Sequence, residues 1–296
     1  MLTTRTIFLT SLAMIAFAGN SLLCRAALQH SSIDAASFTG IRLVCGAAML
    51  WLIVRTRRGT YRGAGSWMSA CALFVYAAGF SFAYVRLPAA TGALLLFGAV
   101  QATMIGRGLW AGERLGRLQL LGFLLALAGL VGLLLPGLAA PPLLHTLLML
   151  GAGVAWGVYS LRGKGAGDAT LVNAGNFLRC VPLAAALSAA TYGNASLDSA
   201  GVWYAALSGA LASAIGYAIW YTALPELKAT SAATVQLSVP VIAALGGVVF
   251  LGETVTLRLV VAAIAILGGI ALVILEKQHV SGAQPAAPAD AASRRG

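Results

Sequence analysis

Long apolar runs, separated by short polar stretches, recur along almost the whole chain. Each run is about 20 residues long, which is the length that a helix needs to cross the ~30 Å hydrocarbon layer of a bilayer. The pattern therefore predicts ten transmembrane helices. Their expected ranges are 6–27, 34–54, 65–84, 88–110, 117–136, 143–161, 171–191, 200–221, 229–251 and 255–275.

The composition strengthens this prediction. Of the 296 residues, 60% are hydrophobic and only 9% are charged, whereas a soluble domain carries about 25% charged residues. The formal net charge is +11, but the Lys and Arg residues are spread over short loops, so we expect no nucleic-acid partner. We expect an all-α polytopic protein in a lipid bilayer.

The loop charges predict an orientation. If the N-terminus is cytoplasmic, the inner loops hold nine basic residues: Arg55, Arg57, Arg58, Arg62, Arg114, Arg117, Arg162, Lys164 and Lys228. The outer connections then hold only Arg86 and Arg258, with Arg25 near the outer end of the first helix. The positive-inside rule favours this arrangement. Both termini would be cytoplasmic, and residues 276–296, rich in Ala and Pro, would form a disordered tail.

The two halves of the chain resemble each other. Four features recur in one order: Arg42 as Arg179, Tyr84-x-x-Leu87-Pro88 as Tyr221-x-x-Leu224-Pro225, Gly112-Glu113 as Gly252-Glu253, and Gly129 as Gly269. The first two pairs are 137 positions apart and the last two are 140 apart. Each half has five predicted helices, so the second repeat, 138–275, would cross the membrane in the opposite sense to the first, 1–137. Such inverted repeats are typical of secondary transporters, whose site lies near the midplane.

The stretch from Tyr221 to Leu275 resembles the last two helices of the second EamA repeat of the drug/metabolite transporter (DMT) superfamily. Four features carry the resemblance: the polar start at 229–233, Pro240, the hinge Gly252-Glu253, and Gly268-Gly269. It extends over about residues 6–275, although the helix at 88–110 has Val100-Gln101 in place of the family's Pro. Over the whole chain, the sequence is similar to YddG-type exporters. This resemblance implies a bacterial inner-membrane carrier, without a cofactor, that exports neutral or aromatic amino acids.

Polar and aromatic side chains deep in the predicted helices are candidate substrate ligands. A buried amide needs a partner, so it faces another helix or a cavity. The candidates are the amides Asn20, Gln101, Asn176 and Gln236, the hydroxyl of Ser238, and the aromatic residues Tyr76, Trp156 and Tyr159. We favour cavity lining for Gln101, whereas packing is an equal alternative for the others.

Two prolines are expected to act as hinges. Pro240 lies near the middle of the helix at 229–251 and, lacking an N–H, leaves the carbonyl of Gln236 without its helical partner. That carbonyl would then lie beside Ser238 at mid-depth. Pro182 frees the carbonyl of Leu178 in the same way. Packing alone is the alternative explanation for both kinks.

The embedded and hinge charges are expected to be structural. Arg42 and Arg179 lie about two turns from a helix end, where an Arg side chain can reach loop carbonyls. Glu113 and Glu253 are expected to cap the N-terminus of the helix that follows each. No Asp or Glu lies at mid-depth of a predicted helix, so we expect facilitated diffusion or weak coupling to protons.

The predicted function is transport of a small molecule by alternating access. A multidrug or quaternary-cation exporter is one alternative, but it would need an embedded acid. A phosphorylated-metabolite exchanger that binds anions with Arg42 and Arg179 is another. A membrane-embedded enzyme or an assembly factor is the alternative from a different class; no metal-ligand spacing or catalytic triad pattern supports an enzyme. The oligomeric state stays open, with a monomer as the working expectation.

Overall fold

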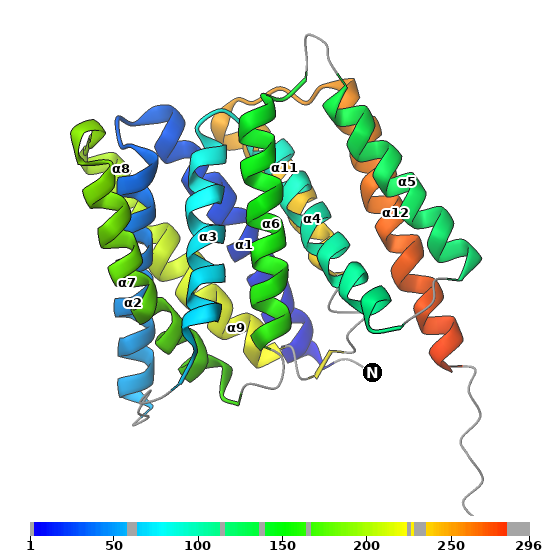
Figure 1. The fold of residues 1–296 in the computed structure, drawn as a ribbon, viewed down its shortest axis with the longest axis horizontal. Helices are drawn as coiled ribbons and strands as arrows, with labels where there is room; N and C mark the ends of the chain where they lie inside the picture. Colours follow the sequence, from blue (N-terminus) through cyan, green and yellow to red (C-terminus); the bar gives the residue numbers. More distant parts are fainter. Residues whose placement is uncertain are drawn as a thin grey trace, which may run out of the picture.

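The computed structural model of the chain is a bundle of α-helices (Figure 1). It describes residues 3–57, 64–112, 116–135, 140–163, 167–223, 226–227 and 235–282. The first half contains α1 (Thr4–His30), α2 (Ala35–Thr56), α3 (Trp67–Tyr84), α4 (Ala89–Trp110) and α5 (Arg117–Leu134). The second contains α6 (Leu143–Gly163), α7 (Ala169–Ala190), η1 (Tyr192–Asn194), α8 (Ser199–Leu207), η2 (Ser208–Ile215), α9 (Gly216–Ala223), α11 (Ser238–Leu251) and α12 (Leu257–Gly282).

Seven helices in the described ranges are long and apolar enough to cross a membrane. They are α1, α2, α3, α4, α6, α7 and the continuous helix Ser199–Ala223, which joins α8, η2 and α9. Three further apolar helices are shorter: Arg117–Leu133, Ser238–Leu251 and Leu257–Leu272. The predicted all-helical class is therefore confirmed, whereas the predicted count of ten membrane spans is not.

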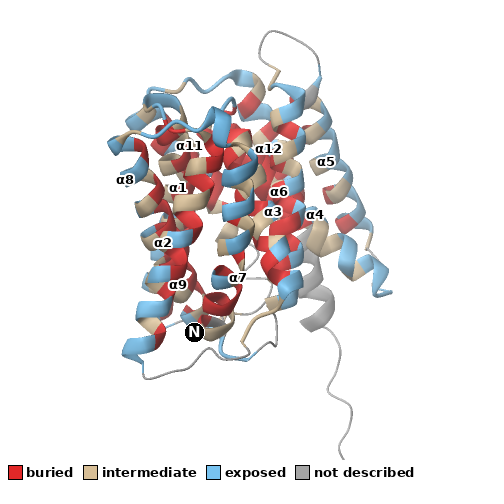
Figure 2. Ribbon diagram, turned by 60° about the vertical axis from the view of Figure 1, so that its left-hand side comes forward, coloured by how far each residue is buried: buried red, intermediate tan, exposed pale blue. Residues whose placement is uncertain are grey.

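Buried residues lie on the inward sides of the helices and exposed residues on the outward sides (Figure 2), and many residues of both kinds are apolar. Phe38, Phe80 and Leu94 are at most 1% exposed in the core, whereas Leu121 and Ile264 on the outer helices are more than half exposed. An apolar exterior of this extent is unsuited to water and matches the hydrocarbon of a bilayer.

The connections between the helices lie at two opposite ends of the bundle. The N-terminus and the C-terminal end of α12 lie at the same end (bottom of Figure 1), which we call the N-terminal face. The opposite face carries the α1–α2 connection, where Asp34 caps α2 by accepting hydrogen bonds from the N–H groups of Ala36 and Ser37, both at 2.9 Å. Its Oδ2 also accepts the N–H of Ser196 at 3.0 Å. This residue therefore ties the α1–α2 connection to the segment between α7 and α8.

Glycines allow α6 to pack closely against α4. A Cβ added at Gly153 would lie 2.6 Å from the carbonyl oxygen of Leu96, and one at Gly157 would lie 2.9 Å from Cβ of Thr103. Small residues give membrane helices this close approach. The Gly153-x-x-x-Gly157 pair is therefore a helix-packing surface.

The α5–α12 pair packs through one glycine on each helix. A Cβ added at Gly129 would lie 3.1 Å from the backbone nitrogen of Ile266, and one added at Gly269 would lie 2.7 Å from that of Ala126. The first helix of each half packs against the other half. α1 packs against the helix Ser199–Ala223 and against α11 of the second half, while α6 packs against α3 and α4 of the first half.

Two details of the C-terminal region bear on the sequence prediction. Residues 235–236 are helical, Leu237 is a turn, and α11 begins at Ser238. The helical winding is therefore interrupted three residues before Pro240, and this break accords with the predicted hinge, because Pro240 has no N–H to offer the carbonyl of Gln236. Helix α12 continues to Gly282, beyond its predicted end at 275, and residues 283–296 lie outside the described residues. Pro182 lies inside α7, which continues past it.

Candidate functional site

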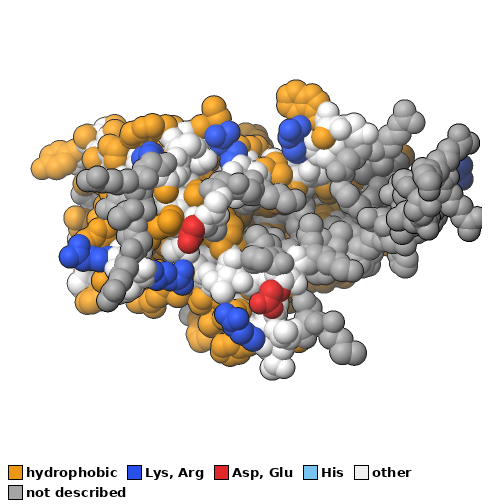
Figure 3. Space-filling view, turned by 90° about the horizontal axis from the view of Figure 1, so that it is seen from below, with side chains coloured by type: hydrophobic (Ala, Val, Ile, Leu, Met, Phe, Trp, Pro, Cys, Tyr) orange, Lys and Arg blue, Asp and Glu red, His pale blue; other side chains and the backbone are white. Residues whose placement is uncertain are grey.

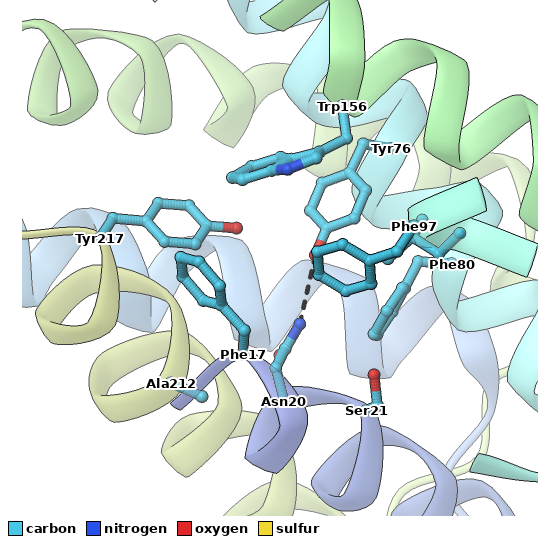
Figure 4. Close-up of a pocket in the computed structure, with 10 residues that line it drawn as sticks. Phe17, Asn20, Ser21, Tyr76, Phe80, Phe97, Trp156, Ala212 and Tyr217 are labelled. Carbon is cyan, nitrogen blue, oxygen red and sulfur yellow. Dashed lines mark hydrogen bonds between the residues drawn. The ribbon is translucent and has the colours of Figure 1, made fainter. Parts of the chain in front are cut away.

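A small cavity lies at the centre of the bundle (Figure 4). Six aromatic side chains line it: Phe17, Tyr76, Phe80, Phe97, Trp156 and Tyr217. The other lining residues are Asn20, Ser21, Leu96 and Ala212. The cavity volume is about 20 Å³, enough for a water molecule and far too small for an amino acid. The described structure is therefore a closed state of this site.

The aromatic side chains pack around Trp156. Its ring centroid lies 4.8 Å from that of Tyr76, 5.0 Å from that of Tyr217 and 5.6 Å from that of Tyr159. Phe17 meets Tyr217 edge to face at 5.9 Å. Contacts of this geometry add stability beyond simple burial. They bring α1, α3, α6 and α9 together around one point.

A network of polar side chains continues from the cavity wall. The hydroxyl oxygen of Tyr76 accepts hydrogen bonds from Asn20 Nδ2 at 3.2 Å and from Arg42 Nη2 at 3.1 Å. The hydroxyl of Ser208 donates to Asn20 Oδ1 at 2.6 Å, and Arg42 Nε donates to the hydroxyl of Ser213 at 3.3 Å. The network links α1, α2, α3 and η2. It connects residues of both halves near the middle of their helices.

Arg42 is a buried cation in this network. Only 1% of the residue is exposed, and its guanidinium carbon lies 5.2 Å from the ring centroid of Tyr76 and 4.9 Å from that of Phe80. The sequence-based expectation that Arg42 reaches loop carbonyls is wrong, because its hydrogen-bond partners, Ser213 and Tyr76, are side chains inside the bundle. Within the described ranges it forms no ion pair. A buried charge without a counter-charge is costly, and cation–π contacts offset part of that cost.

The π-helical winding of η2 places its two serines in this network. Residues five apart lie on different sides of an α-helix, which has 3.6 residues per turn, whereas the i→i+5 bonds of a π-helix bring them towards one side. Gly209 allows η2 to approach α2, since a Cβ added there would lie 2.1 Å from the carbonyl oxygen of Arg42. Ser208 and Ser213 thereby reach Asn20 and Arg42.

Arg179, the repeat counterpart of Arg42, lies in a different environment. Its Nη1 donates to the carbonyl of Ala64 at 2.6 Å and to that of Gly175 at 2.9 Å. The side chain therefore fastens the connection before α3 to α7. This geometry accords with a structural role.

Tyr159 and Asn176 strengthen the same attachment. Asn176 Oδ1 accepts the backbone N–H of Ser66 at 2.9 Å, and its Nδ2 donates to the hydroxyl of Tyr159 at 3.3 Å. The Tyr159 hydroxyl in turn donates to Asn173 Oδ1. Although Tyr159 stacks on Trp156, neither Tyr159 nor Asn176 lines the cavity.

The remaining predicted ligands also lie away from the cavity. Gln101 is 2% exposed within α4 but does not line the cavity. Ser238 donates its hydroxyl to the carbonyl of Val235 at 2.6 Å, and Gln236 precedes α11. The structure thus brings three of the eight predicted ligands, Asn20, Tyr76 and Trp156, to the cavity.

Glu253 caps a helix of the other half. Its Oε2 accepts the backbone N–H of Ala89, the first residue of α4, at 2.8 Å, and its Oε1 accepts Arg25 Nε at 3.0 Å. The expected capping of the helix that follows is wrong, because Thr256 accepts the N–H of Leu259 at the start of α12. Gly252, with φ of 62°, ends α11 in the left-handed conformation, which turns the chain before Glu253. Glu113 lies outside the described residues.

Several cavity and network residues were missing from the sequence prediction. The polar residues Ser208, Ser213 and Tyr217 recur at intervals of five and four in the middle of the helix Ser199–Ala223, and this spacing is a signal that could have been used. Phe17, Phe80 and Phe97 carried no signal, because Phe is ordinary in a membrane helix. Only packing distinguishes these side chains from others facing lipid.

Comparison with known proteins identifies the family. Residues 143–275 match the EamA-like transporter family. This half of the chain belongs to that family. The predicted EamA-like domain of the DMT superfamily is thereby confirmed for this half of the chain. Among the described residues, seven helices are long and apolar enough to cross a membrane.

A relative and a solved structure match nearly the whole chain. The uncharacterized protein PA1977 of Pseudomonas aeruginosa is 60% identical over 271 residues, which cover 91% of this chain and 94% of the relative. A protein crystal structure matches 93% of this chain and 99% of its own chain with a TM-score of 0.67 at 19% identity. At that identity the match shows the fold alone. Neither match supports the YddG-type subtype.

Proposed function

We propose that this EamA-like protein is a secondary transporter of the bacterial inner membrane, with ten transmembrane helices in two inverted repeats, 1–137 and 138–275. It exports small metabolites, foremost neutral and aromatic amino acids, by alternating access. The observation that carries this proposal is the closed cavity between the halves, lined by six aromatic side chains and joined to a polar network. Aromatic and apolar walls suit an apolar side chain, while a few polar groups orient the ligand.

Reciprocal packing supports the inverted repeat. Gly129 faces Ile266, and Gly269 faces Ala126; an offset of 140 converts the first pair into the second, since 126 + 140 = 266 and 129 + 140 = 269. A two-fold axis between antiparallel halves relates contacts in this way.

Contacts at both faces support alternating access. At the opposite face, Arg25 of α1 pairs with Glu253. At the N-terminal face, the hydroxyl of Thr3 donates to Glu226 Oε2 at 3.4 Å, and the hydroxyl of Thr6 donates to the same oxygen. Each contact joins one end of α1 to the second half. Opening of either contact would give the cavity a route to one side of the membrane.

The charges support a cytoplasmic N-terminal face. Viewed from that face, Lys and Arg side chains are spread over the end of the bundle (Figure 3). Arg5, Arg55 and Arg162 lie at the helix ends there, while the ends of α1 and α12 on the opposite face carry Arg25 and Arg258. The positive-inside rule then places both termini in the cytoplasm. The cavity lining contains no Asp or Glu, which favours facilitated diffusion and gives no support to an enzyme.

The two transport alternatives fit the site less well. A cationic drug would have to approach the buried guanidinium of Arg42, which repels it. A phosphorylated-metabolite exchanger that uses both arginines would require Arg179 at the cavity, but Arg179 is engaged with Ala64 and Gly175. The amino-acid proposal needs neither feature.

Uptake into proteoliposomes tests the proposal. We expect saturable uptake of several labelled neutral and aromatic amino acids that is unchanged by an imposed pH gradient. Uphill accumulation driven by the gradient would refute facilitated diffusion, but the assignment as a transporter would stand. Failure of every amino acid, with uptake of organic cations or phosphorylated metabolites instead, would refute the substrate assignment.

A further inference from the structure

Arg42 has one polar atom without a partner. Its Nε and Nη2 are hydrogen-bonded to Ser213 and Tyr76, but the buried Nη1 has no hydrogen-bond partner among the described residues. A buried hydrogen-bond donor without an acceptor costs free energy, and a charged donor costs more. Arg42 does not itself line the cavity, but its guanidinium lies against the rings of two lining residues, Tyr76 and Phe80, so a ligand that enters between them could complete its bonding.

Tyr217 offers a second unpartnered group. Its hydroxyl is buried beside that of Tyr76, without the geometry of a hydrogen bond to any described residue, and the side chain points into the centre of the cavity (Figure 4). Tyr76, which accepts Nη2 of Arg42, lines the same cavity. The Tyr217 hydroxyl and the Arg42 guanidinium thus both lie beside a residue of this aromatic cavity.

We propose that Arg42 and Tyr217 bind a carboxylate of the transported molecule, so that this EamA-like protein recognises monocarboxylates with an apolar or aromatic body. The negative charge satisfies Arg42 in a site where water is largely excluded, and charge-assisted hydrogen bonds are the strong ones there. This inference rests on the proposed transport function and deepens it.

The ammonium group of an amino acid finds no equivalent partner. No carboxylate lies among the residues that line the cavity, and the oxygen of Asn20 already accepts the hydroxyl of Ser208. The amine is therefore tolerated but not required. Carboxylic acids that lack an amine fit the site as well as amino acids do, whereas amines that lack a carboxylate do not.

Four related probes separate the carboxylate from the amine: phenylalanine, 3-phenylpropionate, phenylalanine amide and phenethylamine. Binding to the purified full-length protein is measured by thermal shift and by quenching of Trp fluorescence, neither of which requires transport. We expect the two carboxylates to bind and the amide and the amine to bind at least about tenfold more weakly, as for loss of one charged hydrogen bond.

Variants identify the residues responsible. Tyr217→Phe, which removes only the hydroxyl, should weaken 3-phenylpropionate about tenfold, and Arg42→Lys should weaken it while Arg42→Gln abolishes binding. Tyr204→Phe, in α8 and away from the cavity, and Arg179→Lys are the matched controls and should bind normally. If Arg42→Gln fails to fold, Tyr217→Phe and Arg42→Lys still decide the question.

The outcomes separate this inference from the proposed function. Equal binding of phenylalanine and its amide, or normal binding of carboxylates by Tyr217→Phe and Arg42→Lys, overturns the inference even if amino acids are transported. Arg42-dependent binding of 3-phenylpropionate without binding of any amino acid supports the inference and refutes the amino-acid assignment. Binding of none of the four probes overturns both.

Discussion

Arg25 and Glu253 form an ion pair, with Nε and Oε1 3.0 Å apart, that joins α1 to the hinge between α11 and α12. Both side chains are largely buried, at 13% and 9% exposed. Arg25 also donates to the carbonyl of Tyr84 at 3.0 Å, and Glu253 accepts the N–H of Ala89. The pair thus holds α1, α3, α4 and α11 together at the opposite face, and we expect it to keep that face closed.

Breaking this ion pair should favour opening at the opposite face. In Glu253→Gln, one charge-assisted interaction worth about 1.5 kcal/mol is lost, which corresponds to about tenfold in the population of the open state. Cys24, which precedes Arg25 and is fully buried, reports this opening. In protein with the other three cysteines replaced, we expect thiol reagents to modify Cys24 about tenfold faster in the variant. An unchanged rate would show that the pair does not restrain this face.

The close contact between Gly209 and Arg42 should not tolerate a side chain. A Cβ would lie 2.1 Å from the carbonyl oxygen of Arg42, so η2 must move away from α2. We expect Gly209→Ala to lower stability by about 1–3 kcal/mol, measured as a lower melting temperature in detergent. Gly132→Ala is the matched control, because nothing lies within 4 Å of the added Cβ. Equal melting temperatures would contradict the packing described.

Removing the hydroxyl of Tyr76 should break hydrogen bonds of the polar network while the aromatic ring keeps its place in the cavity wall. In Tyr76→Phe, Asn20 and Arg42 each lose an acceptor, while the aromatic ring stays against Trp156. We expect a loss of stability of about 1–3 kcal/mol, the cost of buried groups left unsatisfied, together with weaker substrate binding. Phe97→Leu alters the same cavity wall, but Phe97 makes none of the hydrogen bonds or ring contacts described for Arg42, so this variant should leave the network intact. A Tyr76→Phe protein as stable as the wild type would argue against the network.

Asp34 should make the opposite face sensitive to acid. Partial burial alone would raise the pKa of its carboxyl, but hydrogen bonds from Ser37, Ser196 and Ala36 outweigh that effect and leave the pKa below its ordinary value of 3.8. A lowered folded-state pKa means that the stabilisation is fully present above 3.8 and is lost as the pH falls through the folded-state pKa.

Comparison with Asp34→Asn tests this assignment. We expect the variant to melt below the wild type at pH 7, because Asn offers one acceptor instead of two. The difference should shrink as the pH falls below 3.8 and through the lowered folded-state pKa, because the wild-type carboxylate then becomes protonated. A difference that is independent of pH would mean that the charge of Asp34 contributes nothing.

Long apolar runs made most helices predictable, whereas contacts between side chains far apart in the sequence were not predictable. The predicted helices at 6–27 and 143–161 lie within α1 and α6, because hydrophobic length alone decides such segments. Pro240 marks the break in helical winding at Leu237, because a Pro cannot donate the hydrogen bond that would continue the helix. The cap that Glu253 provides to Ala89 depends on the meeting of two halves that are far apart in sequence.

The two repeated arginines show the limit of sequence symmetry most clearly. Arg42 and Arg179 occupy equivalent positions, but α2 faces Tyr76 and η2 at the centre, whereas α7 faces the connection at Ala64. Equivalent residues therefore have different partners. Trp156 and Tyr76 could be predicted because they are polar-edged aromatic residues deep in apolar helices, while their Phe neighbours could not.

The central claim is that the aromatic cavity is the site through which substrate passes. Its most direct test is uptake of labelled phenylalanine into proteoliposomes by Trp156→Ala, compared with Trp67→Ala. Trp156 lies at the centre of the aromatic cluster, whereas Trp67 is 57% exposed at the start of α3. We predict that uptake is lost in Trp156→Ala and retained in Trp67→Ala, with both proteins folded. Normal uptake by folded Trp156→Ala would contradict the account.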